Sequence, residues 1–483
     1  MELLIPLDPQ GKKPLYEQIY EYLKEEIRRG NMKPEQRLPS SRLLARSLKV
    51  SRSTVQSAYD QLVAEGYLTA MPKKGYFAAK LEGLMPPVER EAGTGADREA
   101  DRENSRWDVD FSPGGIDLES FPQSTWRRIS REVLKGSGQE IFLKGDPQGD
   151  MPLREAIRDY LHAARGVVCG PDQIVVGAGN EYLLMLLSQL FGTGSEIAME
   201  NPTYLQAFRV LRAMGNEIYP VDMDSQGLDV RRMETLPVRA VYVMPSRQFP
   251  TGIVMPVGRR QELLSWAMRE PGRFIIEDDY DSEFRYKGKP VPAMQGMDAA
   301  GRVIYMGTFS KSIAPAIRIG FLVLPPVLLE RYRERAGFYS STVSRVDQQI
   351  LTAFLTGGYF ERHLNRMREI YKAKHDLLLA ALKPLEKSFF VTGEFAGLHV
   401  LLRCLDGRDE KELLERAAEA GIRVYGQSEF LMENRESAQN SPVQIGETAA
   451  GRPKAPATLI LGYAGLKEEK IRQGAAALAD VWM

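Results

Sequence analysis

The sequence predicts an α/β protein in which a mostly parallel sheet is covered by helices, preceded by a small separate N-terminal domain. From about residue 110 onward, short apolar runs alternate with longer amphipathic stretches, as in βαβ units. Residues 81–109 are instead rich in charged residues, Pro, Gly and Ala, which is typical of a flexible linker. We therefore expect three parts, residues 1–80, 81–109 and 110–483.

Five apolar runs in the large part have the length and composition of buried strands. They are IVVGAG (174–179), EIAMENP (196–202), AVYVMP (240–245), RFIIED (273–278) and VIYMGT (303–308). A further strand is expected at AGLHVLL, which would bury His399. The polar segment 433–456 is expected to be an exposed loop.

Composition excludes several classes of protein. The 483 residues are 43% hydrophobic and 27% charged, which fits a soluble globular chain, and no run of about 18 apolar residues predicts a membrane span. Cys169 and Cys404 form no CxxC pair, and the four histidines are scattered, so neither a disulfide framework nor a metal site is expected. We expect a cytoplasmic protein.

The N-terminal part carries 14 Lys and Arg against 9 Asp and Glu, a net charge of +5 over residues 1–80. Ser40 or Ser41 can cap a helix that runs to about Leu48, and Ser51 can cap a second one. The second helix would bury one stripe of side chains, Val55, Ala58, Tyr59 and Leu62, and end at Gly66. Two short helices joined by a tight turn indicate a helix-turn-helix.

The first turn of that second helix exposes Arg52, Ser53 and Thr54, which are donors suited to base edges and phosphates. Two β-prone runs then flank the sequence from Pro72 to Gly75, which predicts a basic hairpin wing. The alternative is a small helical domain used for packing or dimerisation.

Residues from PLYEQ to KKGYF closely resemble the GntR-type winged helix. The resemblance implies binding to a double-stranded DNA operator, with contacts from the residues at the matching positions. The candidate DNA-binding residues are Arg42, Ser51, Arg52, Ser53, Thr54, Lys73, Lys74 and Gly75.

A lysine at the end of an apolar strand, in TFSKSIAPAIRIG, suits covalent attachment of an aldehyde cofactor. Lys311 would form a Schiff base with pyridoxal phosphate. Thr308 and Ser310 offer hydroxyl groups to its phosphate, and Arg318 offers a planar guanidinium.

The run FIIEDDYDSEF ends a predicted strand in four acids interrupted by Tyr280. It can be interpreted as a solvated turn or a Mg²⁺ site. Pyridoxal chemistry gives a more specific interpretation, because the protonated ring nitrogen needs a carboxylate partner and the ring oxygen needs a donor. Asp278 and Tyr280 could supply them.

Three other segments also follow predicted strands. Gly179 and Asn180 lie where IVVGAGNEY enters a helix, whose N-terminus favours phosphate. Tyr204 could stack on the cofactor ring or belong to the core, and MPSRQFPTG (244–252) is a loop. All these positions fall at strand ends, where open α/β sheets bind ligands.

Together, in this order, these segments resemble the fold-type I pyridoxal-phosphate-dependent aminotransferases over residues 110–483. That fold has a mostly parallel large domain and a smaller C-terminal α+β domain, and its sites usually lie within a homodimer. A winged helix fused to it resembles the MocR-family transcriptional regulators, especially GabR-like members, on QFPTG, IIEDDYDSEF and VIYMGTFSKS.

By this resemblance Lys311 carries the cofactor, and an incoming amine effector displaces it. The resemblance further implies that Asp278 pairs with the ring nitrogen, Tyr280 reaches the ring oxygen and Tyr204 stacks. The phosphate would be held by Gly179, Asn180, Thr308, Ser310 and Arg318.

The sequence departs from its relatives at four pocket positions. Ile460 stands where aminotransferases hold the substrate carboxylate with arginine, and Phe249 replaces their Asn before Pro-Thr-Gly. Gln206 and Glu429 replace two effector-pocket arginines of members that bind γ-aminobutyrate. A glutamate there would repel a carboxylate, so the effector is expected to be another amine.

We therefore predict a pyridoxal-phosphate-binding, DNA-binding transcriptional regulator that senses an amine. The missing arginine argues against net transaminase turnover. Two alternatives remain, an active aminotransferase with a DNA-binding head and a regulator that senses pyridoxal phosphate itself.

Overall fold

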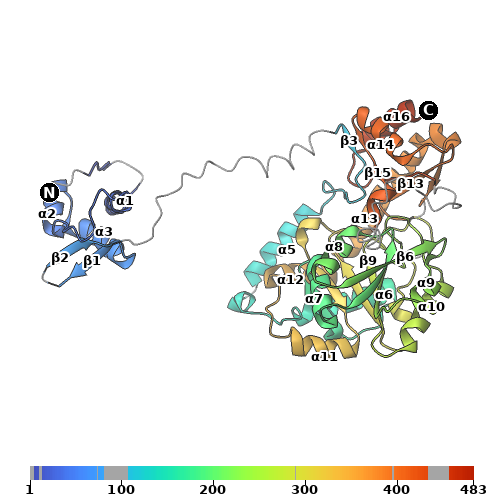
Figure 1. Ribbon diagram of the computed structural model, residues 1–483, viewed down its shortest axis with the longest axis horizontal. Coiled ribbons are helices and arrows are strands. Elements are labelled where there is room, and N and C mark those ends of the chain that lie inside the picture. The colour runs from blue at the N-terminus through green and yellow to red at the C-terminus, as the bar shows by residue number, and fades with distance from the viewer. Residues whose placement is uncertain are drawn as a thin grey trace, which may run out of the picture. The chain divides into compact units, whose positions relative to one another are not determined.

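The computed structural model describes residues 5–9, 13–72, 74–80, 107–136, 138–288, 290–393, 396–432 and 456–483. The chain divides between Asp101 and Arg102 into two compact units (Figure 1). The predicted linker, 81–109, lies outside the described residues except for its last three, and Val109 already belongs to a strand of the second unit. The predicted polar loop, 433–456, also lies outside them up to residue 455.

The first unit is a winged helix-turn-helix. Its helices are α1 (Leu15–Arg28), α2 (Ser41–Leu48) and α3 (Arg52–Ala64), and its wing is the antiparallel pair β1 (Leu68–Met71) and β2 (Gly75–Ala78). The predicted stripe of α3, Val55, Ala58, Tyr59 and Leu62, is fully buried. Ser40 Oγ accepts from Leu43 N at 3.2 Å and Ser51 Oγ accepts from Thr54 N at 3.0 Å, so both helices have the side-chain caps that the sequence predicts.

The second unit is built on an eight-stranded sheet. Its strands, in spatial order, are β4 (Ile174–Gly177), β11 (Gly320–Val323), β10 (Val303–Thr308), β9 (Phe274–Asp279), β8 (Ala240–Val243), β5 (Glu196–Asn201), β6 (Glu217–Asp224) and β7 (Gly227–Leu228). Strands β10, β9, β8, β5 and β6 are parallel neighbours, whereas β11 and β7 run antiparallel to theirs. All five predicted strands are confirmed.

Helices cover both faces of this sheet (Figure 1). Alternate residues of the strands face opposite cores, because successive side chains of a strand point to opposite faces. One face packs on α7 (Asn180–Phe191), α8 (Leu205–Ala213) and α11 (Pro326–Arg335). The other packs on α6 (Met151–Arg165), α9 (Val230–Glu234), α10 (Val257–Arg269), α12 (Arg345–Thr356) and α13 (Tyr359–Ala381), with α5 (Gln123–Gly136) beside α12.

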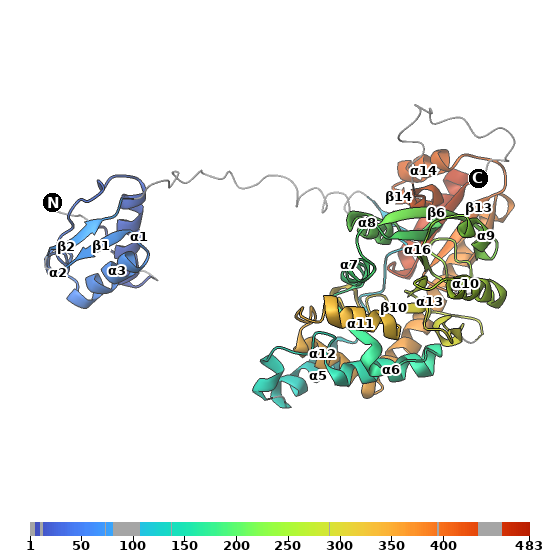
Figure 2. The ribbon, with the colours of Figure 1, turned by 60° about the horizontal axis from the view of Figure 1, so that its bottom comes forward.

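A smaller antiparallel sheet follows near the C-terminus. Its order is β12 (Phe389–Thr392), β13 (His399–Cys404), β16 (Thr458–Gly462) and β15 (Tyr425–Gly426). Helices α14 (Glu410–Glu419) and α16 (Glu468–Trp482) lie beside it (Figure 2), and β14 (Ile422–Arg423) pairs with β3 (Val109–Asp110). His399 is buried in β13 as predicted. No helix in the described ranges could cross a membrane.

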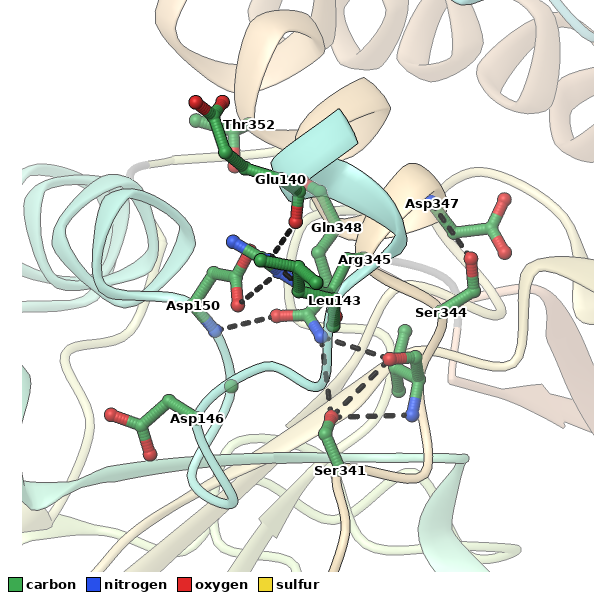
Figure 3. Close-up of polar contacts among 12 residues, drawn as sticks. Glu140, Leu143, Asp146, Asp150, Ser341, Ser344, Arg345, Asp347, Gln348 and Thr352 are labelled. Carbon is green, nitrogen blue, oxygen red and sulfur yellow. Dashed lines mark hydrogen bonds and ion pairs between the residues drawn. The ribbon is translucent and has the colours of Figure 1, made fainter. Parts of the chain in front are cut away.

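A polar cluster fastens the segment before α6 to α12 (Figure 3). Arg345 Nε donates to Asp150 Oδ2 at 2.8 Å, and Asp150 N donates to Gln348 Oε1 at 2.7 Å. Gln348 Nε2 also donates to Val343 O at 2.9 Å. The neighbouring Thr342 Oγ1 accepts from Ala178 N at 3.1 Å, so the cluster supports the turn between β4 and α7.

The acidic end of β9 is buried rather than solvated, because all six residues of the strand are buried. Each carboxylate has its own partner. Glu277 accepts from Met294 N and Gln295 N at 2.8 Å. Asp278 accepts from the Tyr242 hydroxyl, Asp279 from Arg165 and Tyr305, and Asp281, just beyond the strand, from Arg247. The described residues contain no cluster placed to hold a metal, which removes support for the Mg²⁺ interpretation.

Burial of Asp278 gives the unit a pH-dependent stability. Burial raises the pKa of Asp278 to about 7, against the lowering effect of the Tyr242 hydrogen bond. An acid whose pKa is raised in the folded state binds more protons folded than unfolded, so stability falls as pH rises from about 4 to about 7. Asp278→Asn removes this titration.

We expect the loss of unfolding free energy between pH 5 and pH 7.5 to be about 2 kcal/mol smaller in Asp278→Asn than in the unaltered cofactor-free protein. Urea denaturation followed by tryptophan fluorescence measures it, since all four tryptophans lie in the second unit. Asp172→Asn is the control, because the Asp172 side chain is 68% exposed. Equal losses in all three proteins would contradict the prediction.

Candidate functional site

The first unit presents the candidate DNA-binding residues at the starts of two helices and on the wing. Arg42, Arg52, Ser53 and Lys74 are exposed, and Thr54 is half-buried. The Ser51 hydroxyl is used internally, since it lies 2.7 Å from both the Ser53 and the Thr54 hydroxyls as it caps α3. Lys73 lies outside the described residues.

Gly75 begins β2 with φ +111°, a conformation that favours glycine at the wing. A Cβ built on it would lie 3.6 Å from Arg37 Nε, so this exposed arginine stands beside the wing as a further cation. Sequence reasoning did not single out Arg37.

The second unit has a pocket of about 780 Å³, including the part open to solvent, at the carboxyl edge of its sheet. Strands β4, β5, β8, β9 and β10 all end there, and antiparallel β11 begins there. The pocket is lined by Pro113, Gly114, Asn180, Glu181, Tyr204, Met244, Phe249, Asp278, Tyr280, Thr308, Ser310, Lys311 and Arg318. Eight of the nine predicted cofactor residues are among these, and the ninth, Gly179, lies directly behind Arg318.

Lys311 lies three residues beyond the end of β10, and its Nζ donates to Gly114 O at 2.5 Å. Burial lowers the pKa of Lys311, and the Asp281 carboxylate partly opposes this. A lowered pKa makes a larger fraction of the amine neutral, and the neutral amine is the nucleophile that adds to a carbonyl.

Asp278 is 2% exposed, and of the four acids in the EDDYD run it alone lines the pocket. One carboxylate oxygen accepts from Tyr242, whereas the buried Oδ1 has no hydrogen-bond partner among the described residues. A buried acceptor without a partner is costly, so Asp278 is suited to a ligand that brings a donor such as a protonated ring nitrogen.

Arg318 and Gly179 meet at the N-terminus of α7. Arg318 adopts φ +52°, and its Nη2 donates to Glu181 Oε2 at 2.6 Å and to Ala178 O at 3.2 Å. A Cβ on Gly179, which has φ +87°, would lie 2.5 Å from Arg318 Nη2. Only glycine therefore lets the guanidinium approach the free amides of the helix N-terminus, which together form an anion site.

Hydroxyl and amide groups complete this end of the pocket. Thr308 Oγ1 donates to Ser310 Oγ at 3.0 Å and accepts from Ser310 N at 3.1 Å. The Asn180 Oδ1 atom is buried and has no hydrogen-bond partner among the described residues. These groups lie beside Arg318 in the pocket lining, where they could contact a phosphate.

Aromatic rings form another part of the lining. The ring of Phe249 makes edge contacts with Tyr204 at 6.1 Å, Tyr280 at 6.0 Å and Phe430 at 5.1 Å between centroids. Tyr204 is half-buried and lines the pocket, so one edge-on contact leaves it available to a ligand. The loop 244–252 thus supplies two wall residues, Met244 and Phe249.

Several site residues were missed by sequence reasoning. Tyr242 lies inside β8 and Arg247 inside a quoted loop, where the sequence gives no sign that they contact Asp278 and Tyr280. Gly114 comes from the beginning of the second unit, and only the fold places its carbonyl against Lys311. Glu181 directly follows Asn180 at the predicted helix N-terminus, so the sequence could have indicated it as a partner for Arg318.

The structure does not bring the two predicted effector residues into this pocket. Gln206 lies on α8 and is absent from the lining. Glu429 is exposed, accepts from Gly426 N at 2.7 Å and lines a separate depression that contains Arg209 and Arg212. Ile460 is fully buried within β16.

The arrangement fits pyridoxal phosphate. An amine of lowered pKa lines the same pocket as a carboxylate oxygen that has no hydrogen-bond partner among the described residues, and an arginine approaches a helix N-terminus over a glycine. Lys311 would hold the aldehyde carbon, Asp278 the ring nitrogen, and Arg318, Thr308, Ser310 and Asn180 the phosphate.

Two family models match the chain. Residues 15–77 match the bacterial regulatory proteins of the gntR family, and residues 114–440 match aminotransferase class I and II. Among solved structures, the chain is similar to kynurenine aminotransferase from Pyrococcus horikoshii, with 26% identity and a TM-score of 0.65 over 82% of this chain and 96% of that one. A multiple substrate aminotransferase from Thermococcus profundus gives 27% identity, a TM-score of 0.65, and coverage of 82% and 95%.

Curated relatives share both parts. The HTH-type transcriptional regulator YdeL of Bacillus subtilis is 39% identical, with 97% of each chain covered. The rhizopine catabolism regulatory protein MocR of Rhizobium meliloti is 33% identical over 99% of this chain and 96% of its own. The pyridoxine biosynthesis regulator PdxR of Corynebacterium glutamicum is 32% identical, with 89% and 91% covered. The chain belongs to the MocR-like HTH-type transcriptional regulators, in which a gntR-type winged helix is fused to an aminotransferase class I and II domain.

Proposed function

We propose that this regulator binds pyridoxal phosphate through Lys311 and senses an amine that displaces this lysine from the cofactor. The observation that carries the proposal is the meeting of Lys311, the unpartnered Asp278 oxygen and Arg318 in one pocket. Pyridoxal phosphate supplies an aldehyde that exchanges reversibly between one amine and another. The protein acts in the cytoplasm as a homodimer whose two winged helices bind a repeated operator.

The contact between Lys311 and Gly114 offers a route from cofactor to DNA. Gly114 lies a few residues after β3, near the start of the second unit in the sequence. Its turn is tightly packed, since a Cβ on Gly462 would lie 2.0 Å from Ser112 O. When Lys311 leaves or regains the Gly114 carbonyl, the segment that carries the chain toward the winged helix loses or regains a hydrogen bond.

The pocket also limits the effector class. Lys311 and Arg318 are the cations in its lining among the described residues; the proposed phosphate occupies Arg318, and Lys311 is bonded to the cofactor until the effector displaces it. Apart from Glu181, whose carboxylate accepts from Arg318, the remaining lining consists of Pro113, Gly114, Met244 and Phe249, which carry no side-chain donor for a carboxylate. We infer an amine with an apolar or uncharged body, since a carboxylate would be desolvated there without a partner. This makes γ-aminobutyrate a poor candidate.

Loss of the anchoring amine tests the cofactor proposal. Lys311→Ala should abolish the visible absorbance of protein-bound pyridoxal phosphate, because no amine remains to bond its aldehyde carbon. Borohydride reduction of the unaltered protein should leave a peptide modified at Lys311, detected by mass spectrometry. Lys135→Ala, at an exposed lysine of α5, is the control. A reducible linkage that persists in Lys311→Ala would refute the assignment.

Gly179→Ala tests the phosphate site against a matched glycine. Both ends of α7 carry a glycine of positive φ, but a Cβ on Gly179 meets the Arg318 guanidinium whereas one on Gly192 meets nothing within 4 Å. Displacing Arg318 should weaken pyridoxal phosphate binding by at least about tenfold, the value of one charge-assisted hydrogen bond. Titration of the cofactor absorbance should show no such loss for Gly192→Ala. Equal effects would mean that backbone strain alone is responsible.

Arg52→Ala tests DNA binding by the first unit. If Arg52 contacts a base edge, affinity for DNA upstream of the regulator's own gene should fall by about 1–3 kcal/mol, measured by fluorescence anisotropy. Arg29→Ala removes the same charge from a side chain that is 65% exposed at the C-terminal cap of α1. It should reduce the affinity for DNA less than Arg52→Ala does. Affinity of the unaltered protein should fall steeply with salt as counterions are released. Affinity that does not depend on salt would contradict the proposal.

A further inference from the structure

Arg247 is a buried cation directly behind the pocket wall, and its exposed fraction is 4%. Its Nη1 donates to Asp281 Oδ2 at 3.0 Å and to Tyr280 Oη at 3.3 Å, and its Nη2 donates to His399 O at 3.0 Å. Arg247 does not line the pocket, whereas Tyr280 does. The guanidinium therefore acts on the pocket through Tyr280.

The space around Arg247 is shaped to hold the guanidinium in one place. A Cβ on Gly397 would lie 2.1 Å from Arg247 Cζ, so a side chain at that position would displace it. The following residue, Gln248, fixes the loop, because its Nε2 donates to Pro202 O at 2.8 Å and its Oε1 accepts from Thr251 Oγ1 at 2.6 Å. Such confinement gives Arg247 a defined direction toward Tyr280.

The charges around this group are balanced locally. Asp281 neutralises Arg247, with Asp279 and Lys311 beyond it, and Asp278 and Tyr463 also face the cluster. His399 Nε2 lies 2.9 Å from Pro250 O, which can only accept, so the proton of the ring is on Nε2. Burial and Arg247 lower the pKa of His399 well below its usual value, so this ring is neutral.

The Tyr280 hydroxyl carries one proton and accepts one hydrogen bond from Arg247. Burial raises the pKa of Tyr280 well above its usual value, so the hydroxyl stays protonated. Since the arginine has no acceptor, Tyr280 Oη must accept in this contact, and its own O–H points elsewhere. The direction left open is the pocket that Tyr280 lines.

We propose that Arg247 is a positioning residue that makes Tyr280 a hydrogen-bond donor to an anionic oxygen in the pocket, namely the ring oxygen of the bound cofactor. This rests on the proposed function. The loop 244–252 carries Phe249, whose side chain cannot donate a hydrogen bond. Arg247 lies two residues before Phe249, so through Tyr280 this loop still contributes to hydrogen bonding in the pocket. Donation from Tyr280, which Arg247 directs, stabilises the ionised ring oxygen.

The test is the pH midpoint at which the absorbance of the bound cofactor changes between its protonated and deprotonated forms. Tyr280→Phe should raise this midpoint by about one unit, because the ionised oxygen loses its donor. Arg247→Met combined with Asp281→Asn, which leaves no unpaired buried charge, should raise it by a similar amount. Adding Tyr280→Phe to that pair should give no further rise, because Arg247 acts through Tyr280.

Arg247→Lys and Arg247→Gln serve as milder variants if the neutral pair folds poorly, and thermal unfolding checks each protein. Arg247→Lys keeps the charge without the fork, and Arg247→Gln keeps a donor without the charge, so each should give a smaller rise than the neutral pair. Variants that lose thermal stability but keep the midpoint of the unaltered protein would overturn the inference, since Arg247 would then be only structural. Fully additive shifts would also overturn it.

Failure of the proposed function is distinguishable from failure of this inference. If the unaltered protein acquires no cofactor absorbance that depends on Lys311, both fall together. If it does and the midpoint is insensitive to Tyr280 and Arg247, only the role of Arg247 is wrong.

Discussion

The site is organised around the burial of four carboxylates at the end of one strand. Removing a carboxylate from water is tolerated only where donors or cations replace the water, so each acid of β9 and its turn requires a partner from a neighbouring element. Arg165 comes from α6, Arg247 from the loop after β8, and Tyr305 from β10. These elements are thereby held in place around Asp278, the acid of this run that lines the pocket and whose Oδ1 has no hydrogen-bond partner among the described residues.

The same edge of the sheet joins segments that are distant in sequence. Parallel strands have their carboxyl ends at the same edge of the sheet. The loops after β4, β5, β8, β9 and β10 therefore meet at this edge, although they are far apart in the sequence. The Gly114 turn reaches this edge from the start of the second unit, and close packing against Gly462 fixes it there. Lys311 and the first turn of the second unit consequently share one hydrogen bond.

The sequence was sufficient for the strands, both helix caps of the winged helix, and eight residues that line the pocket, because period, capping and motif order are local signals. It was insufficient where packing decides. Only their positions relative to motifs predict Gln206 and Glu429 as pocket residues, whereas Glu429 accepts from Gly426 N and lines a separate depression. Arg247 belongs to the predicted loop 244–252. Its contacts with Tyr280 and Asp281 depend on the close approach of its guanidinium to Gly397, which no local sequence pattern reveals.

The distribution of cations around the pocket supports the proposed sensing of an amine. Ile460, predicted from the resemblance to replace an arginine of the aminotransferases, is fully buried in β16 and offers only an apolar side chain. The cation that does approach the pocket from behind, Arg247, is neutralised by Asp281 and excluded from the lining. Among the described residues of the lining, the one guanidinium, Arg318, is paired with Glu181, so no unpaired guanidinium is available to bind a carboxylate. Such a pocket favours reversible occupation by an amine over the paired carboxylate binding that efficient transamination of amino acids requires.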